Sequence, residues 1–145
     1  MAQTDEFDLQ NFLPYLLNQA AEESSLAFQK AYKDRYGMLR TEWRVLFHLG
    51  IYGRMTAKDI GARSKMHKTK ISRAVARLAE RRFLTRDRND ADRRLEYLEL
   101  TPAGTRAYQD LREVAVEYDT RLVARFSEEE AQLLRGMLKR LMGDG

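Results

Sequence analysis

Two groups of basic side chains near the middle of the chain could bind a polyanion. The first lies in residues 66–82, MHKTKISRAVARLAERR, where seven of seventeen residues are Lys, Arg or His. The second is the pair Arg93 and Arg94 in RDRNDADRRLEYLELT. Between Arg54 and Arg94 there are fourteen Lys or Arg and five Asp or Glu, a local charge of +9, whereas the rest of the chain carries −5. Because each neutralised phosphate releases condensed counterions, this separation of charge favours nucleic acid as the partner.

Residues 66–82 are predicted to form one helix with an apolar side and a basic side. At ~100° per residue, Ile71, Val75 and Leu78 share the inner face, and the opposite face is basic around the small Ala76. Such a helix suits a DNA groove, with arginines at base edges or phosphates and the first residues at the backbone. The expected DNA contacts are Lys68, Thr69, Lys70, Ser72, Arg73 and Arg77. A merely solvated face is the alternative, but it would more often include acids than the single Glu80 found here.

The segment after this helix is predicted to be a β-hairpin with a basic tip. Apolar residues alternate with polar ones in EYLEL, and a charged turn precedes that run. A hairpin beside a groove-reading helix would act as a wing, and the narrow minor groove of A·T-rich DNA attracts arginine. Arg93 and Arg94 are therefore expected to contact DNA. Asp90 and Asp92 are expected to brace these arginines or to accept hydrogen bonds from turn amides. The alternative is a plain exposed hairpin.

The remaining elements follow from apolar residues that recur at steps of three and four, which predict long helices at both ends of the chain. The first helix is expected from 11 to 34, and a short third helix begins at a Thr56–Asp59 capping box. The other expected helix ends are Thr41, Gly50 and Gly53 for the second helix, Thr101 with Pro102 for the fifth and Ser127 with Glu130 for the sixth. The predicted fold is mainly α with a small β-hairpin wing (α+β), a winged helix-turn-helix domain at 39–101 flanked by helices at 11–35 and 102–142.

The two helical flanks carry more apolar surface than the small basic module can cover. In the last helix an apolar edge is formed by Leu133, Leu134, Met137, Leu138, Leu141 and Met142. Exposed apolar surface of this extent marks an interaction site, and a second copy of the chain is a natural partner. We therefore expect residues 11–35 and 102–142 to form a homodimer. An intramolecular bundle in a monomer is the alternative.

Composition and motifs exclude several other classes of protein. The 145-residue chain has no cysteine and only two histidines, so a disulfide framework, a thiolate metal site and a redox-active thiol are excluded. We find no phosphate loop, nucleophile elbow or HExxH motif, and we expect no catalytic residue, metal, cofactor or enzymatic activity. The first residues, MAQTDEFDLQ, do not resemble a signal peptide, and no apolar run approaches ~20 residues. We therefore expect a cytoplasmic protein without a membrane partner.

The order of these elements resembles the MarR family of bacterial winged-helix transcription regulators. The similarity rests on the short capped helix, the basic helix and the hairpin carrying DADRRLEYLELTPAG, and LRTEWRVLFHL looks like the second helix of that family. The resemblance implies that the basic helix enters the major groove of double-stranded DNA and that one wing arginine enters the minor groove. It also implies a homodimer on a pseudo-palindromic operator, acting as a repressor that a small-molecule effector relieves.

The resemblance further implies a site for a small aromatic or anionic effector between the dimer helices and the DNA-binding domain. Tyr15, Trp43 and His48 lie on elements that border that cleft in the resembling proteins, and they offer stacking surface and a titratable donor. Such residues on helices are more often part of a core. The alternative function is a winged-helix module that binds protein or RNA without ligand control, because the fold does not fix the partner. An RNA-binding module would more often place aromatic residues among its basic ones.

Overall fold

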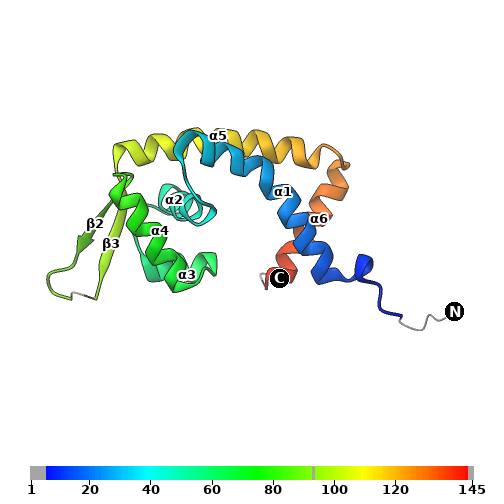
Figure 1. The fold of residues 1–145 in the computed structure, drawn as a ribbon, viewed down its shortest axis with the longest axis horizontal. Coiled ribbons are helices and arrows are strands. Elements are labelled where there is room, and N and C mark those ends of the chain that lie inside the picture. Colours follow the sequence, from blue (N-terminus) through cyan, green and yellow to red (C-terminus); the bar gives the residue numbers. More distant parts are fainter. Residues whose placement is uncertain (1–5, 93, 144–145) are drawn as a thin grey trace.

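The chain folds into a head and a helical arm (Figure 1). A computed structural model describes residues 6–92 and 94–143. The head, residues 39–101, contains α2 (Arg40–Tyr52), β1 (Met55–Thr56), α3 (Ala57–Ser64), α4 (Lys68–Glu80), β2 (Leu84–Arg88) and β3 (Glu96–Leu100). The arm contains η1 (Leu9–Asn11), α1 (Leu13–Tyr36), α5 (Pro102–Val123) and α6 (Glu128–Met142). The predicted fold, mainly helical with a small β-hairpin, is confirmed.

The three strands form one antiparallel sheet in the order β1, β3, β2. β2 and β3 are the predicted hairpin, in which Leu84 lies opposite Leu100. β1 pairs with the other edge of β3, where Met55 lies opposite Leu98 and both side chains are buried. The sequence does not predict β1, because two residues are too few to show an alternating pattern.

Three of the predicted helix caps are confirmed and one is wrong. A side-chain oxygen accepts a hydrogen bond from the N–H three residues later, at 3.0 to 3.1 Å, at Thr56, Thr101 and Ser127. Thr41 is not a cap, because α2 already begins at Arg40. The N–H of Leu39 donates instead to Oε1 of Glu42 at 3.3 Å. The helix starts earlier than predicted because this carboxylate, and not the threonine hydroxyl, satisfies the free amide.

Gly50 and Gly53 have different roles, although the sequence predicts that both end α2. Only Gly53 does so, with a φ of 80°. Gly50 lies within α2, where an added Cβ would lie 2.4 Å from Cγ of Tyr108. A side chain at this position would clash with the ring, so Gly50 allows α5 to approach α2 closely.

The core of the head lies where α2, α4 and the first half of α5 meet. Val45 and Leu46 of α2, Leu78 of α4 and Leu111 of α5 are all 0% exposed. Each such side chain contributes roughly 1.5–3 kcal/mol through burial. Helix α4 is therefore held to the head by its apolar face, while its other face remains outside.

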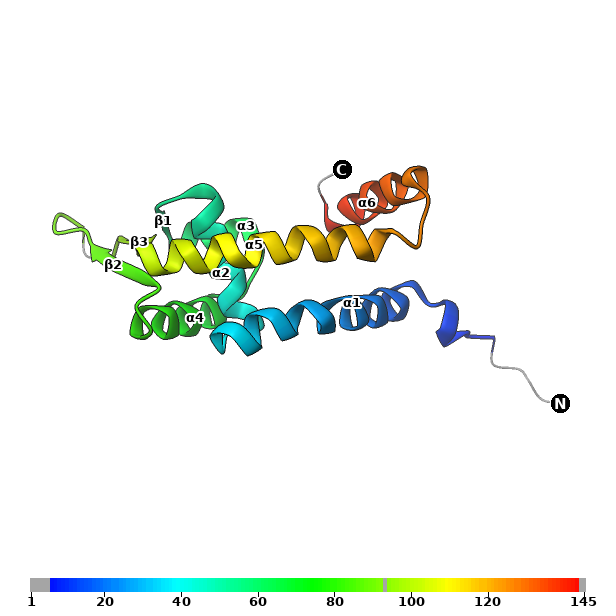
Figure 2. The same ribbon diagram turned by 90° about the horizontal axis from the view of Figure 1, so that it is seen from above.

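Polar contacts tie the helices of the arm to one another and α6 to the head. α1 runs along α5 (Figure 2), and at its last turn Tyr36 donates a hydrogen bond to Asp110 of α5 at 2.7 Å. Arg35 pairs with the other carboxylate oxygen at 2.8 Å. These two hydrogen bonds hold the pKa of Asp110 below its ordinary value, and the bond from Tyr36 has the larger effect. At the end of α6, the Nζ of Lys65 donates to the carbonyl oxygen of Met142 at 2.5 Å.

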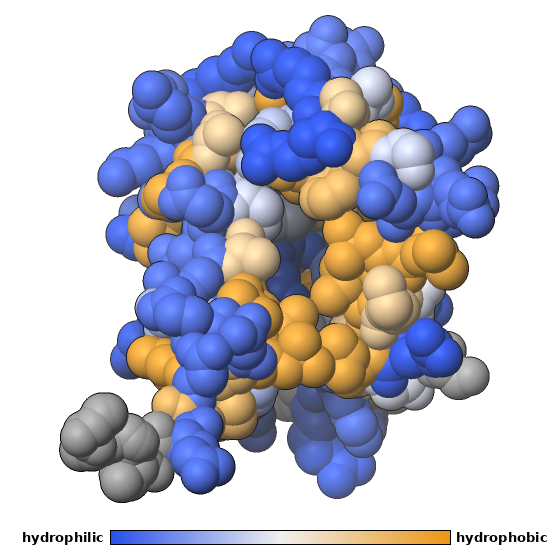
Figure 3. Space-filling model, turned by 90° about the vertical axis from the view of Figure 1, so that its right-hand side faces the viewer, coloured by the Kyte–Doolittle hydropathy of each residue, from blue (hydrophilic) through white to orange (hydrophobic). Residues whose placement is uncertain are grey.

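The arm also exposes a large apolar surface. α6 has no buried residue, and its apolar side chains lie at the same end of the molecule as those of η1 and the start of α1. Figure 3 shows apolar residues gathered there on both sides of a hollow. This apolar arm surface comprises Leu9, Phe12, Leu13, Leu16, Leu133, Leu134, Met137, Leu138, Leu141 and Met142. Within residues 6–92 and 94–143, no helix is long and apolar enough to cross a membrane.

Candidate nucleic-acid interface

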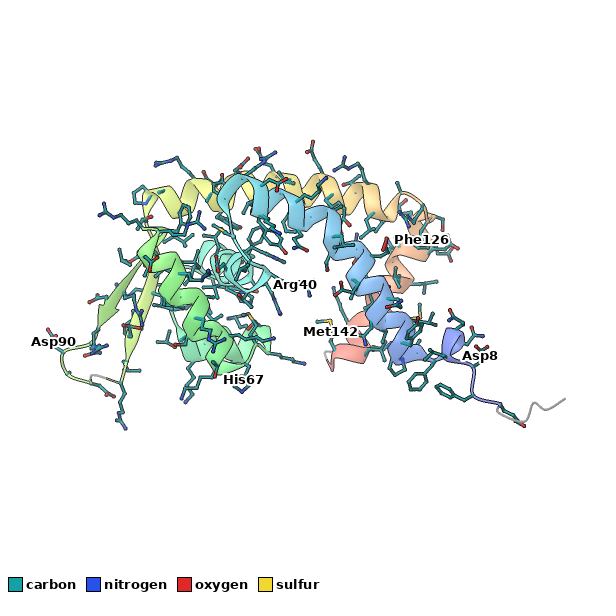
Figure 4. All side chains as sticks on the ribbon, in the orientation of Figure 1. Asp8, Arg40, His67, Asp90, Phe126 and Met142 are labelled. Carbon is teal, nitrogen blue, oxygen red and sulfur yellow. The ribbon has the colours of Figure 1, made fainter. Side chains whose placement is uncertain are left out.

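α4 is fixed by its inner face and by its first turn. Ile71, Val75 and Leu78 are at most 2% exposed, as the helical spacing predicts. The helix begins after His67, whose Nδ1 accepts a hydrogen bond from the N–H of Thr69 at 3.1 Å. His67 lies at the lower edge of the head, away from α5 (Figure 4). The start of α4 is therefore presented to the outside on a rigid support.

The outer face of α4 carries side chains that are free to bind an anion. All six predicted contact residues on this helix are exposed: Lys68, Thr69, Lys70, Ser72, Arg73 and Arg77. In the part of the chain that the structure describes, Lys68, Lys70 and Arg73 form no ion pair and no side-chain hydrogen bond. Three cations without an internal partner near the start of one helix can approach phosphates without first breaking a contact.

Arg77 differs from these three cations. Its Nε lies 3.4 Å from Oε2 of Glu42, a residue of α2 that is only 2% exposed. The Arg77 side chain itself is 55% exposed. Sequence reasoning missed Glu42, because an acid in the first turn of a helix is usually a solvated capping residue. The structure thus divides the two predicted arginines of α4 into a free one, Arg73, and a paired one.

The tip of the hairpin presents Arg94 to the outside. Its side chain is 91% exposed, and Asp92 accepts hydrogen bonds from its Nε at 3.1 Å and its backbone N–H at 3.0 Å. The hydrogen bonds from Arg94 lower the pKa of Asp92, and the bond from the Arg94 side chain has the larger effect. The Asp92 carboxylate therefore stays ionised at neutral pH. Arg93 lies outside the described residues. Asp90 is exposed and braces no arginine among residues 6–92 and 94–143.

The turn is instead held by a residue that the sequence analysis did not single out. Oδ1 of Asn89 accepts hydrogen bonds from the N–H groups of Ala91 and Asp92, at 2.8 and 3.2 Å. Asparagine is common in turns for this reason, so the type of residue carried a usable signal. Asn89, and not Asp90, accepts these two backbone hydrogen bonds.

Both arginines on the strands of the hairpin, and Arg54 just before β1, already pair with acids. Arg54 pairs with Asp87 at 2.9 Å, and Arg86 pairs with Glu96 at 3.0 Å. Arg54 also lies over the ring of Tyr97, 4.8 Å from its centroid. The strands of the hairpin therefore carry little unpaired positive charge, in contrast to Lys68, Lys70 and Arg73 of α4.

A second candidate site is a hollow of about 410 Å³ between α1, α2 and α5. Its wall is mostly aromatic and is formed by Ser24, Ser25, Phe28, Trp43, Phe47, Ala115, Tyr118, Asp119 and Leu122. Of the three residues predicted for an effector, only Trp43 lines it. The hydroxyl of Tyr15 accepts a hydrogen bond from Gln19, one turn away. His48 donates from Nδ1 to the carbonyl oxygen of Arg44 at 2.6 Å.

Comparison with known proteins identifies the family. A model of the MarR family matches residues 36–95, which include α2, α3, α4 and the start of the hairpin. The HTH-type transcriptional regulator YwoH of Bacillus subtilis is 25% identical over 120 residues, covering 81% of this chain and 87% of that protein. A MarR/EmrR family transcriptional regulator from Acinetobacter sp. ADP1 is 25% identical, with a TM-score of 0.83 over 94% of this chain and 96% of that one. Residues 36–95 therefore match the MarR family, and the whole chain has the fold of a MarR/EmrR family regulator.

These similarities make the chain a MarR-type transcription regulator with a winged-helix DNA-binding domain. A mutant of MarR from E. coli, in complex with operator DNA, has the same fold at a TM-score of 0.83 and 17% identity, over 95% of this chain and 99% of that one. The resemblance stated from the sequence is confirmed.

Proposed function

We propose that this MarR-family protein is a homodimeric repressor that binds a pseudo-palindromic operator and is released by a small effector. The observation that carries the DNA-binding part is the row of unpaired cations on α4, beside the exposed Arg94 of the hairpin. α4 enters the major groove with Arg73 at base edges, while Lys68, Thr69, Lys70 and Ser72 contact the backbone. Arg94 reaches the neighbouring minor groove.

The apolar arm surface supports the homodimer. Side chains such as Leu133 and Leu141, each 58% exposed, are too apolar to face water over a whole helix. In this proposal residues 11–35 and 102–142 form the two-fold interface, and residues 39–101 form the DNA-binding domain. Two heads related by a two-fold axis then read two half-sites with centres ~10–10.5 base pairs, or a multiple of that, apart.

The deciding experiment is a titration of the protein into the intergenic DNA next to its own gene. A random duplex of equal length is the control, and both are measured at two salt concentrations. We expect saturable binding that favours the intergenic fragment, at one dimer per site, and that weakens steeply with salt. Equal binding to both duplexes would contradict a sequence-specific regulator and would favour the alternative of a winged-helix module with another partner.

Replacement of Arg94 tests the wing. We expect Arg94→Ala to weaken operator binding by ~1–3 kcal/mol, because it removes a groove contact. The free energy of unfolding should change little, since the side chain is 91% exposed. Arg112→Ala is the matched control, because Arg112 is an exposed arginine on α5, outside the hairpin and α4. If both variants bound the operator equally well, the wing would not contact DNA.

The hollow beside Trp43 supports an aromatic effector more than an anionic one. Its wall contains four aromatic rings and no Lys or Arg. The only acid in the wall, Asp119, already pairs with Arg135 of α6 at 2.8 Å. A planar, uncharged ligand can stack on these rings without leaving a charge unpaired. A ligand at this place would contact α1, α2 and α5 together, so it could change the position of the head relative to the arm.

Trp43 is the single tryptophan of the chain, so its fluorescence reports on this hollow. We expect uncharged aromatic compounds that weaken operator binding to quench Trp43 as well, at the same concentrations. Phe47→Ala, which removes a neighbouring ring 5.0 Å from that of Trp43, should raise the concentration needed for both effects. A compound that released DNA and left the Trp43 emission unchanged would place the effector elsewhere.

A further inference from the structure

Glu42 is an unusual residue for this position. It is the one charged residue with a buried side chain in the described part of the chain, at 2% exposed. Its two carboxylate oxygens have different surroundings. Oε1 accepts a hydrogen bond from the N–H of Leu39, whereas Oε2 has no hydrogen-bond partner. A buried carboxylate oxygen without a partner costs folding free energy, so an opposite charge nearby is needed to offset it.

Arg77 supplies that charge from the recognition helix. Its Nε lies 3.4 Å from Oε2, outside hydrogen-bond geometry but close enough for a charge–charge attraction, which solvent screens only in part because Glu42 is buried. Among the described residues, no other cation lies within ion-pair distance of Glu42. The guanidinium is therefore held toward α2 by a carboxylate that cannot turn away to solvent.

We propose that Glu42 is a positioning residue for DNA binding and that it acts through Arg77. The proposal rests on the proposed function, since it assigns a role on the DNA-binding face. Glu42 neutralises Arg77 and ties α4 to α2 from inside the head. Arg77 consequently sets the position of α4 and contributes little to phosphate binding, whereas Arg73, one turn earlier, is a free DNA contact. Glu42 thus keeps general affinity for DNA low and leaves recognition to the unpaired side chains.

Replacing the carboxylate by an amide tests this idea. Glu42→Gln keeps the size of the side chain and the acceptor for the N–H of Leu39, but it removes the charge that holds Arg77. Arg77 then becomes available to one more phosphate. Each phosphate contact makes the slope of log affinity against log salt steeper by about 0.9. The ratio of the affinity of Glu42→Gln to that of wild type, measured on random DNA, should therefore be about threefold larger at 50 mM than at 200 mM salt.

The experiment uses one fixed random-sequence duplex of about 30 base pairs and a series of salt concentrations. Wild type is compared with Glu42→Gln, Arg77→Gln and the double variant. We expect Glu42→Gln to bind this duplex more tightly and with a steeper salt slope, and we expect this gain to vanish when Arg77→Gln is also present. Glu80→Gln is the control for general loss of charge, because Glu80 is an exposed acid on α4 with no ion pair in the described residues.

A purely structural role for Glu42 would give a different result. In that case Glu42→Gln would bind the random duplex more weakly than wild type, and its salt slope would not become steeper. This result would overturn the proposal. An equal gain in affinity from Glu80→Gln would also overturn it. Thermal unfolding shows whether Glu42→Gln is folded. If it is not, Arg77→Gln and Arg73→Gln still decide: we expect Arg73→Gln to lower the salt slope by about one contact and Arg77→Gln to lower it much less. Equal losses would contradict the proposal. A wild-type protein without salt-dependent DNA binding would instead contradict the proposed function.

Discussion

Arg77→Ala is expected to lower the free energy of unfolding by about 2 kcal/mol. It leaves the Glu42 side chain, which is 2% exposed, without its cation. Removing one partner of a fully buried ion pair costs about 3–5 kcal/mol, and an exposed pair contributes about 0–1 kcal/mol. The expected value lies between these limits because the Arg77 side chain is 55% exposed. Urea denaturation at neutral pH measures the difference.

Arg73→Ala is the matched control for this measurement. It removes the same side chain one turn earlier on the same helix, where no ion pair is lost, and it should change stability by less than about 0.5 kcal/mol. The double variant Arg77→Ala with Glu42→Gln should recover part of the loss, because the buried charge is gone as well. If Arg77→Ala and Arg73→Ala had the same free energy of unfolding, the contact between Glu42 and Arg77 would not contribute to stability.

Leu138→Asp is expected to separate the dimer and to reduce operator affinity by on the order of 100-fold or more, since a monomer loses the benefit of a second linked head. Leu138 lies in the apolar arm surface and is 37% exposed in the single chain. The subunit should stay folded, because α6 has no buried residue. Sedimentation velocity reports the change in mass, and the operator titration reports the change in affinity.

Gln132→Asp is the control for the added charge on α6, because Gln132 is exposed and lies outside the apolar arm surface. It should remain dimeric and bind the operator as wild type does. A Leu138→Asp variant that sedimented as a dimer with unchanged affinity would show that α6 is not part of the interface. The exposed leucines of α6 would then need an explanation other than dimerisation.

The parts of the head that were predictable are those in which a repeating pattern decides the structure. The buried face of α4 follows from apolar residues at helical spacing, and the hairpin follows from the alternation in EYLEL. β1 was not predictable, because its pairing depends on Leu98, more than forty residues away in the chain. Such long-range pairing leaves no local trace in a two-residue strand.

The candidate site was predicted in its composition but not in its internal contacts. Exposure of Lys68, Lys70 and Arg73 follows from the helix pattern alone. The pairing of Arg77 does not, because it depends on the burial of Glu42 under a neighbouring helix, which only the packed structure defines. The residues predicted for an effector were chosen by resemblance to a family. Such a resemblance predicts the positions of helices better than the directions of individual side chains, and only Trp43 lines the hollow.

The length of α5 has a consequence for how the protein can be switched. It is one unbroken helix of 22 residues, so it extends about 33 Å at about 1.5 Å per residue. Its first half belongs to the core of the head through Ala107 and Leu111, and its other end leads into α6. The helix therefore acts as a lever. A tilt of about 10° at the arm displaces the head by about 6 Å. This distance is nearly the rise of two base pairs, at about 3.4 Å each. A small rotation between the arms is therefore enough to put one head out of step with its half-site.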